Sequence, residues 1–336
     1  MKKEITRKVV EGFNLSRDEA RTAMETIMNG EATDAQIGGF LVAMRLKGET
    51  VEEIASFTRV MREKVTRIDA GTKDVLDTCG TGGDGAGTFN ISTISAFVAA
   101  GAGITVAKHG NRSVSSQCGS ADVLKELGVD LDITPERISE CLKTVGIAFL
   151  FAPKLHASMK YAIGPRRELG IRTFFNILGP MTNPAGAQRQ LMGVYSEELV
   201  EIVAGVLADL GSEKAFVVHG HDGLDEITTT DVTTVAEVRN GTVSMTTINP
   251  VDFGIEKAHP DDLKVGTVSE NTAIFKAVLS GKHGPKRDIV MLNSAFAICA
   301  GGAADTPEEG IKLSKESIDS GAALAKFEAL KEFTNK

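Results

Sequence analysis

The chain has 336 residues, of which 42% are hydrophobic and 24% charged, and its formal net charge is −8. This composition is that of a globular protein of about two domains, and it excludes disordered and fibrous classes. The negative charge, with no lysine/arginine block longer than two residues, argues against nucleic-acid binding through a broad basic face.

The spacing of the cysteines and the length of the apolar runs indicate the cellular compartment of the protein. Cys79, Cys118, Cys141 and Cys299 lie far apart with no CxxC pair, which argues against a zinc ribbon or a redox dithiol and favours a reducing compartment. The basic start lacks the apolar region of a signal peptide, and the most apolar run, 94–107, is shorter than the ~20 residues that span a bilayer. We therefore expect a cytoplasmic protein with no membrane or nucleic-acid partner.

The first seventy residues predict helices only. Ser16 with Glu19, and Thr50 with Glu53, match the capping box, in which a hydroxyl and a carboxylate satisfy free amides at a helix start. Apolar residues between these positions recur at helical spacing, and Gly48 is placed to end a helix. We predict about four helices that form a small all-helical domain over residues 1–70.

From residue 72 onward, short apolar runs alternate with amphipathic stretches. The predicted strands are 75–77, 104–107, 147–151, 190–194 and 215–218, and the predicted helices between them are 91–100, 121–127, 135–145 and 197–210. Such alternation predicts right-handed crossovers and a mostly parallel central sheet. An antiparallel hairpin is expected over 232–247 with Asn240-Gly241 at its turn. Helices at 269–279, 286–300, 307–318 and 322–333 close an α/β domain made of residues 72–151 and 186–336.

Residues 152–185 interrupt this alternation. The segment carries several basic side chains and is followed by Gly-Pro and Asn-Pro pairs. We expect it to leave the sheet, cross to the helical domain and return, which would form a hinge and a cleft.

A glycine-rich loop from Gly80 to Thr88 follows the first predicted strand and precedes a helix expected to begin at Asn90. Glycines let backbone N–H groups converge, and a helix start adds partial positive charge, so the loop predicts an anion site. Gly80, Gly82 and Gly85 also satisfy GxGxxG. The second strand ends in a cationic stretch, however, where an NAD site needs an acidic residue. An NADP site using Arg112, and a tight turn without a ligand, remain alternatives; the P-loop pattern is absent.

The stretch Lys108–Ser113 follows the second strand, at the carboxyl edge where open α/β sheets bind ligands. Lys108 and Arg112 would supply positive charge. Short donors suited to phosphate oxygens come from Asn111, Ser113, Ser115 and Ser116. A solvated polar loop is the alternative interpretation.

Asp225 and Glu226 follow another predicted strand. Two unit charges 4 Å apart interact by roughly 4 kcal/mol at an effective dielectric near 20, so carboxylates beside phosphates need a cation between them. Mg²⁺ prefers one or two carboxylates together with phosphate and water oxygens. The pair therefore predicts a magnesium site, with a solvent-facing acidic turn as the alternative.

These motifs carry a resemblance that covers essentially the whole chain. The blocks are Gly80–Asp84, Asn90–Thr93, Lys108–Ser116, Gly119–Asp122, Arg172–Pro180, Thr182–Pro184 and Asp222–Glu226. In this order they closely resemble the anthranilate phosphoribosyltransferase family. The resemblance implies the fold class of the nucleoside phosphorylases and anthranilate-type phosphoribosyltransferases, with a small helical domain and a larger α/β domain.

The resemblance also implies a reaction. The phosphoribosyl group of 5-phosphoribosyl 1-diphosphate (PRPP) passes to the amine of anthranilate, giving N-(5-phosphoribosyl)anthranilate and diphosphate, in the second step of tryptophan biosynthesis from chorismate. Two Mg²⁺ ions and a homodimer formed through the helical domain are implied. No dedicated acid or base is implied, because the aromatic amine is already neutral at pH 7.

Residue roles follow from the same resemblance. PRPP binding is implied for Gly80, Gly83, Asp84, Thr88, Asn90, Ile91, Ser92, Thr93, Lys108, His109, Gly110, Asn111, Arg112, Ser113, Val114, Ser115, Ser116 and Ser120. Anthranilate binding is implied for Gly80, Asn111 and Arg166, with Arg167 as the alternative to Arg166. Ser92 would contact one Mg²⁺, and Asp225 with Glu226 the other.

Three other functions fit parts of the sequence. A pyrimidine-nucleoside phosphorylase shares the architecture but uses inorganic phosphate and a nucleoside; Asn111–Ser113 and the Asp225–Glu226 pair favour a diphosphate with a metal. A non-catalytic nucleic-acid-binding relative is disfavoured by the net charge of −8. The third alternative function is that of an NADP oxidoreductase, which the GxGxxG pattern and Arg112 would fit.

Overall fold

The computed structural model describes residues 2–112 and 118–336 and begins with a helical bundle. Its helices are α1 (Lys3–Val10), α2 (Arg17–Met28), α3 (Asp34–Lys47) and α4 (Val51–Lys64). Both predicted capping boxes are confirmed, and a third, of Thr33 with Gln36, starts α3. Gly48 ends α3 with a φ of 83°, a conformation that glycine adopts at little cost.

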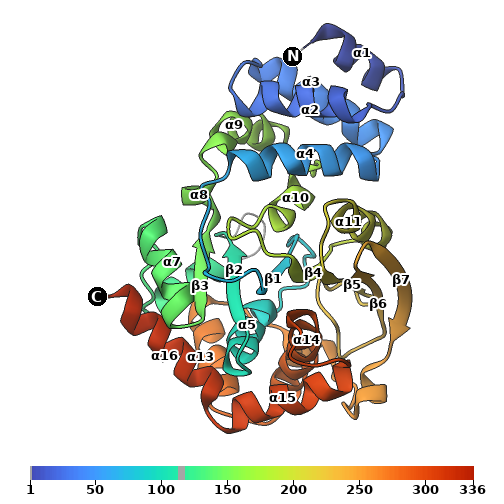
Figure 1. Ribbon diagram of the computed structural model, residues 1–336. Helices are drawn as coiled ribbons and strands as arrows, with labels where there is room; N and C mark the ends of the chain where they lie inside the picture. The colour runs from blue at the N-terminus through green and yellow to red at the C-terminus, as the bar shows by residue number, and fades with distance from the viewer. Residues whose placement is uncertain (1, 113–117) are drawn as a thin grey trace.

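The bundle is completed by residues from the segment 152–185. Helix α9 (Lys160–Leu169) packs against α2 and α3, as Figure 1 shows. The ring of Phe174 stacks on Phe57 with centroids 4.6 Å apart and meets Phe40 edge-on at 6.2 Å. The segment also forms α8 (Ala152–Leu155), α10 (Phe175–Leu178) and 3₁₀ turns at Ala157–Met159 and Gly179–Met181, for which the sequence analysis predicted no helix. The division into two hinged domains stays a prediction.

Seven strands form one sheet in the order β3-β2-β1-β4-β5-β6-β7. They are β1 (Val75–Gly80), β2 (Thr105–Gly110), β3 (Ile147–Phe151), β4 (Arg189–Gly193), β5 (Lys214–Gly220), β6 (Thr233–Arg239) and β7 (Thr242–Ile248). The first five are parallel and the last two antiparallel, which confirms the predicted sheet and hairpin. Asn240 and Gly241 have φ values of 48° and 82°, as a two-residue type I′ turn requires.

The predicted ends of β1 and β2 are wrong by three residues. The sequence analysis ended these strands at Asp77 and Ala107, whereas they continue to Gly80 and Gly110. The additional residues include Thr78, Lys108 and His109, whose polar side chains resemble a loop in sequence but are buried in the structure.

Helices cover both faces of the sheet (Figure 1). The remaining ones are α5 (Ile91–Gly101), α6 (Ser120–Glu126), α7 (Pro135–Thr144), α11 (Glu198–Asp209), α12 (Pro260–Leu263), α13 (Val268–Leu279), α14 (Pro285–Gly301), α15 (Pro307–Asp319) and α16 (Ala322–Thr334), with a 3₁₀ turn at Pro250–Phe253. Alternate residues of β5 pack into two different hydrophobic cores. Phe216 and Val218 belong to the core that contains α5 and α14, whereas Ala215 and Val217 belong to the core shared by α11 and the bundle. Within the described residues, no helix has both the length and the apolar character needed to cross a bilayer.

The order of the strands fixes where a ligand can bind. Successive strands run from β1 outward to β2 and β3 on one side, and from β4 outward to β5 on the other. The crevice at the carboxyl ends of β1 and β4 is therefore a topological switch point, the usual ligand position in open α/β sheets. The chain also passes between bundle and sheet here, since Thr66 N–H donates to Leu155 O (2.9 Å) and Ile68 N–H to Pro184 O (3.0 Å).

Candidate active site

The glycine loop and the acidic turn meet at this crevice. Gly82 N–H donates to Asp225 Oδ2 at 2.7 Å. A Cβ on Gly80, at the end of β1, would lie 2.6 Å from the same oxygen. A side chain at position 80 would therefore displace the Asp225 carboxylate from this hydrogen bond.

Backbone conformation in the loop requires glycine at four positions. Gly82, Gly83, Gly85 and Gly87 have φ values of 63°, 77°, 75° and 66°, a region that other residues rarely adopt. Such turns leave consecutive backbone N–H groups free to point at one ligand. The loop is thus suited to bind an anion, as its sequence predicted.

The start of α5 lies beside the loop. Asn90 occupies the N-cap position, and Ser92 N–H donates to Glu226 Oε1 at 3.0 Å. Ile91 is 1% exposed, so only its backbone is available to a ligand. The buried Asn90 Oδ1 and Thr93 Oγ1 have no hydrogen-bond partner among the described residues.

Lys108 lies in the floor of the site rather than on its surface. Its side chain is buried, and its ammonium donates to Thr78 O and, at 3.4 Å, to Ser92 Oγ. Asp77, which is completely buried, accepts from His109 N–H at 3.0 Å and from Asn183 Nδ2 at 2.7 Å. Burial raises the pKa of Asp77 to about 6 and lowers the pKa of Lys108. The sequence analysis expected Lys108 to be a free pocket cation, whereas it is hydrogen-bonded within the protein.

Asp225 and Glu226 are partly buried and lie close to further negative charge. Desolvation raises the pKa of both carboxyl groups; Asp84 raises that of Asp225 further, and Asp225 that of Glu226. Three carboxylates at one place are unfavourable without a compensating cation. The proximity of Asp84 to the pair was not foreseen from the sequence.

The donor set fits Mg²⁺. Across residues 2–112 and 118–336, no three His, Cys, Asp or Glu side chains are arranged to hold a metal ion. Two carboxylates and the nearby Ser92 hydroxyl are a partial set that phosphate and water oxygens would have to complete. Mg²⁺ is commonly bound in this way.

Two polar residues outside the predicted site support the acidic turn. Asp222 accepts from the hydroxyls of Thr228, at 2.6 Å, and Thr230. Asn293, from α14, accepts from Ile227 N–H at 2.9 Å and donates to Ile227 O at 2.8 Å. Both backbone groups of the residue after Glu226 are thereby fixed.

The loop after β2 is only partly described. Asn111 and Arg112 are exposed, and Ser120 Oγ donates to Asn111 O at 3.3 Å. A Cβ on Gly110 would lie 2.6 Å from the Phe149 ring, so this position also excludes larger residues. The predicted ligands Ser113, Val114, Ser115 and Ser116 lie outside the described residues. Thr88 forms an isolated β-bridge with Lys264.

A buried histidine pair joins β2 to the segment 152–185. His109 Nε2 lies 3.1 Å from His156 Nε2, so one ring donates and the other accepts. Burial lowers the pKa of His109 to about 3 and that of His156 to about 4. Both rings are therefore neutral at pH 7.

Three arginines of the same segment differ in their surroundings. Arg166 is half-buried with its guanidinium 5.1 Å from the centre of the Phe175 ring, and burial lowers its pKa. None of the contacts described for Arg166 joins it to Gly80 or Asn111. The neighbouring Arg167 is exposed. Arg172, for which the sequence analysis predicted no site role, donates to Gly83 O and lies over the Tyr195 ring at 4.2 Å.

Comparison with known proteins agrees with this arrangement. The model described as "Glycosyl transferase family, a/b domain" matches residues 72–324, and "Glycosyl transferase family, helical bundle domain" matches residues 3–65. An anthranilate phosphoribosyltransferase of Pelotomaculum thermopropionicum is 58% identical over 334 residues, which cover 99% of this chain and 97% of that one. The chain belongs to the anthranilate phosphoribosyltransferase family.

Solved structures of anthranilate phosphoribosyltransferases share the whole fold. The protein from Thermus thermophilus superposes with a TM-score of 0.94 at 40% identity, over 99% of both chains. The Saccharomyces cerevisiae protein, in complex with PRPP and Mg, has a TM-score of 0.89 at 30% identity, over 99% of this chain and 97% of that one. Another structure of the yeast protein contains 4-fluoroanthranilate, with a TM-score of 0.88 at 29% identity over the same shares. The family resemblance and the α/β fold class predicted from the sequence are confirmed.

Proposed function

We propose that this protein transfers the phosphoribosyl group of PRPP to the amine of anthranilate, releasing diphosphate, in the second step of tryptophan biosynthesis. One observation carries the proposal. Hydrogen bonds from Gly82 N–H to Asp225 and from Ser92 N–H to Glu226 join an amide-rich anion site to a carboxylate pair. A diphosphate ester with a divalent cation needs both at one place. The named relatives, at up to 58% identity, support the same reaction.

PRPP would bind along the carboxyl edge of the sheet. The backbone amide of Gly83 suits the phosphates, with Thr88, Thr93 and Ser120 as hydroxyl donors. The exposed Asn111 and Arg112 would contact the substrate from the other side. The buried positive charge of Lys108, in the floor of the site, would offset the negative charges of Asp77 and Glu226.

The difficult step is the loss of diphosphate from C1 of the ribose. The C1–O bond breaks as the amine nitrogen bonds to C1, so positive charge develops on the sugar and negative charge on the leaving group. Oriented N–H groups stabilise the leaving diphosphate. Mg²⁺, when bound, supplies further charge neutralisation there; we propose two ions, one at Ser92 and one at Asp225 and Glu226. The amine is neutral before attack, so no side chain is needed as a dedicated base.

Anthranilate fluorescence gives the direct test. Anthranilate, PRPP and Mg²⁺ are mixed with the protein, and a parallel reaction contains EDTA. Loss of anthranilate fluorescence that EDTA prevents is the expected result. Unchanged fluorescence, with no calorimetric binding of either substrate, would contradict the proposal and favour a nucleoside phosphorylase or a binding protein.

We assign the anthranilate carboxylate to Arg166, together with Gly80 and Asn111. Arg166→Ala is expected to raise the KM for anthranilate by about tenfold or more, because a charge-assisted hydrogen bond contributes roughly 1.5–3 kcal/mol. The KM for PRPP should stay close to that of the wild type. Arg167→Ala is the matched control, because the neighbouring guanidinium is exposed. An effect of Arg167→Ala alone, or of Arg166→Ala on PRPP alone, would show that the anthranilate site is misplaced.

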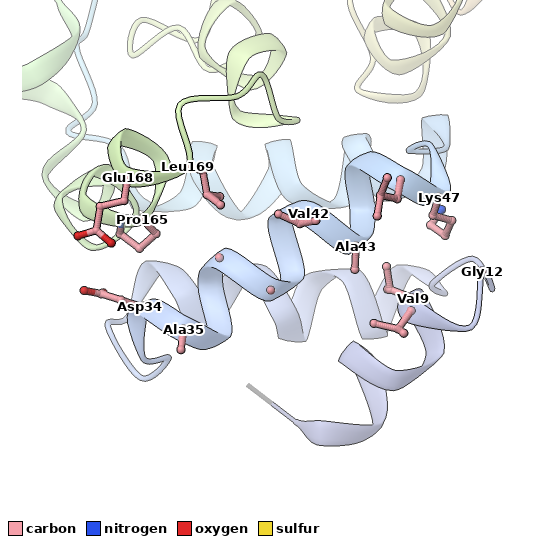
Figure 2. A pocket seen from close by; sticks show the side chains of 14 residues that line it. Val9, Gly12, Asp34, Ala35, Val42, Ala43, Lys47, Pro165, Glu168 and Leu169 are labelled. Carbon is pink, nitrogen blue, oxygen red and sulfur yellow. The ribbon is translucent and has the colours of Figure 1, made fainter.

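We further propose a homodimer formed through the helical bundle. A groove of about 840 Å³ runs between α1, α3 and α9, lined by apolar side chains such as Val9, Val42, Pro165 and Leu169 (Figure 2). Two other lining residues, Leu46 and Val10, are 83% and 68% exposed. Apolar surface of this kind is costly in a monomer. A second copy of the chain is the occupant we propose.

Leu46→Asp is expected to convert the dimer into a monomer, because a carboxylate would be buried in the apolar contact. Light scattering coupled to size-exclusion chromatography measures the change. Met245→Asp, at a 48% exposed apolar residue of β7, is the control that should leave the mass unchanged. A monomeric wild type, or a dimer that survives Leu46→Asp, would contradict this interface. The cytoplasmic location stays a prediction from composition.

A further inference from the structure

A segment from the C-terminal half of the chain, 264–271, lies along the exit of the glycine loop. Val265 N–H donates to Gly87 O at 2.9 Å, and Thr88 forms its isolated antiparallel bridge with Lys264. Farther along, the side chain of Asn271 accepts from Asn90 N–H at 3.0 Å. Three successive contacts therefore fix the loop where it enters α5.

The segment is itself held firmly. Thr267 Oγ1 accepts from Glu270 N–H at 3.1 Å, and the Glu270 carboxylate accepts from Thr267 N–H and Gly266 N–H, both at 2.9 Å. This capping box starts α13, which packs against α5 and α6. Asn271 lies one turn into α13 and is 2% exposed. Its amide is thus presented to Asn90 from a rigid helix.

The glycine loop needs such a support. Its four left-handed glycines leave the backbone conformationally free, and the Asn90 side chain makes no cap hydrogen bond at the start of α5. The Asn271 carbonyl oxygen accepts from the Asn90 N–H, which is the role that the N3 side chain has in a capping box.

Buried polar atoms without hydrogen-bond partners lie at the contact between Asn271 and Asn90, which indicates a ligand position there. Asn271 Nδ2, Asn90 Oδ1 and Thr93 Oγ1 are buried without a partner among the described residues. Buried polar atoms without a partner are unfavourable unless a ligand or a solvent molecule supplies the missing hydrogen bond. The contact between Asn271 and Asn90 therefore lies at the edge of the anion site.

We propose that Asn271 is a positioning residue for PRPP. It holds the Asn90 amide, and through it the start of α5, so that the unpaired side-chain atoms of Asn90 and Thr93 lie where the substrate would supply their partners. This inference rests on the proposed function, because it assumes that PRPP binds at this loop. Asn271 itself need not touch the substrate.

Calorimetric titration of PRPP with Mg²⁺ into Asn271→Leu tests the proposal. Leucine has the same branched shape but no acceptor, so we expect the Kd and KM for PRPP to rise about tenfold, with the KM for anthranilate within about twofold of wild type. Asn271→Ser, whose shorter side chain does not reach Asn90, should give the same change with less disturbance of packing. Val278→Ala is the control, since it creates a cavity about two turns farther along the same helix, at a residue 2% exposed. Thermal melting of all variants measures the loss of stability separately.

The outcomes are distinguishable. Wild-type protein that fails to bind PRPP would overturn the proposed function itself. Wild-type binding with an unchanged Kd in both Asn271 variants would overturn only the positioning role. An equal rise in Kd for Val278→Ala, or an equal rise in both substrate KM values, would assign the effect to loosening of α13 and likewise overturn it. A selective rise for PRPP in the Asn271 variants supports it.

Discussion

Exchange of Asp225 for Asn together with Glu226 for Gln is expected to lower turnover at physiological Mg²⁺ by about 10²–10³-fold or more, the range found when one charge-stabilising group is removed from an active site. The amides keep the shape of the turn and can still accept from Gly82 N–H and Ser92 N–H. They lack the negative charge that would hold the cation. The measurement is the rate of anthranilate fluorescence loss over a Mg²⁺ titration.

The control for this double exchange is Asp231→Asn. Asp231 is an acidic residue near the turn that pairs with Lys257 at 3.8 Å. Its replacement should leave the Mg²⁺ dependence unchanged. Wild-type turnover in the double variant would remove Asp225 and Glu226 from the metal site.

Stability gives a second readout of the same variant. Both carboxyl groups have a raised pKa in the folded protein, so above the ordinary carboxyl pKa of about 4 the folded state binds more protons than the unfolded state. The contribution of the pair to the free energy of unfolding therefore falls as pH rises through this window. In EDTA, the double variant should lose less stability than the wild type between pH 5 and 8. A steeper loss in the variant would contradict the raised pKa values.

Gly193→Ala is expected to abolish activity through steric displacement. A Cβ on Gly193, at the end of β4, would lie 1.5 Å from the backbone oxygen of Asp225. Backbone cannot rotate away as a side chain can, so the whole acidic turn must move. We expect a fall in kcat/KM of about 10²-fold or more, since a misplacement of about 1 Å can cost this much, and a stability loss of about 1–3 kcal/mol.

Gly205→Ala is the control for Gly193→Ala. Its Cβ would lie 3.2 Å from a methyl group of Val51, which needs to shift by only a few tenths of an ångström, and alanine is the better helix former within α11. Kinetics and thermal melting of both variants should separate them clearly. A Gly193→Ala protein with wild-type kcat/KM would show that the position of Asp225 is not critical.

The sheet, and the placement of three candidate ligand-binding elements at its carboxyl edge, were predictable because their signals are local. The glycine loop, the stretch after β2 and the acidic turn each follow an apolar strand, and carboxyl ends of parallel strands meet at one edge. The ends of β1 and β2 were not predictable. The polar side chains there are stabilised by partners far along the chain, such as Asn183 for Asp77, and sequence spacing does not reveal such pairs.

The supporting residues were missed for the same reason. Asn271 bonds to a residue 181 positions away, and Asn293 to one 66 positions away. Helix α9 was missed because Pro165 lies inside it, where proline normally disfavours a helix. Packing of α9 on α2 and α3 outweighs that local preference.

The stacking of Phe174 between Phe40 and Phe57 determines when the N-terminal bundle can form during synthesis. The four N-terminal helices leave the ribosome well before residue 174, without the ring that fills their core. That ring is encoded between β3 and β4, so the bundle reaches its final packing only after three of the five parallel strands have been made. We therefore expect a fragment of residues 1–70 to be less stable than the same residues in the intact chain, which should unfold with the bundle and sheet in one cooperative transition.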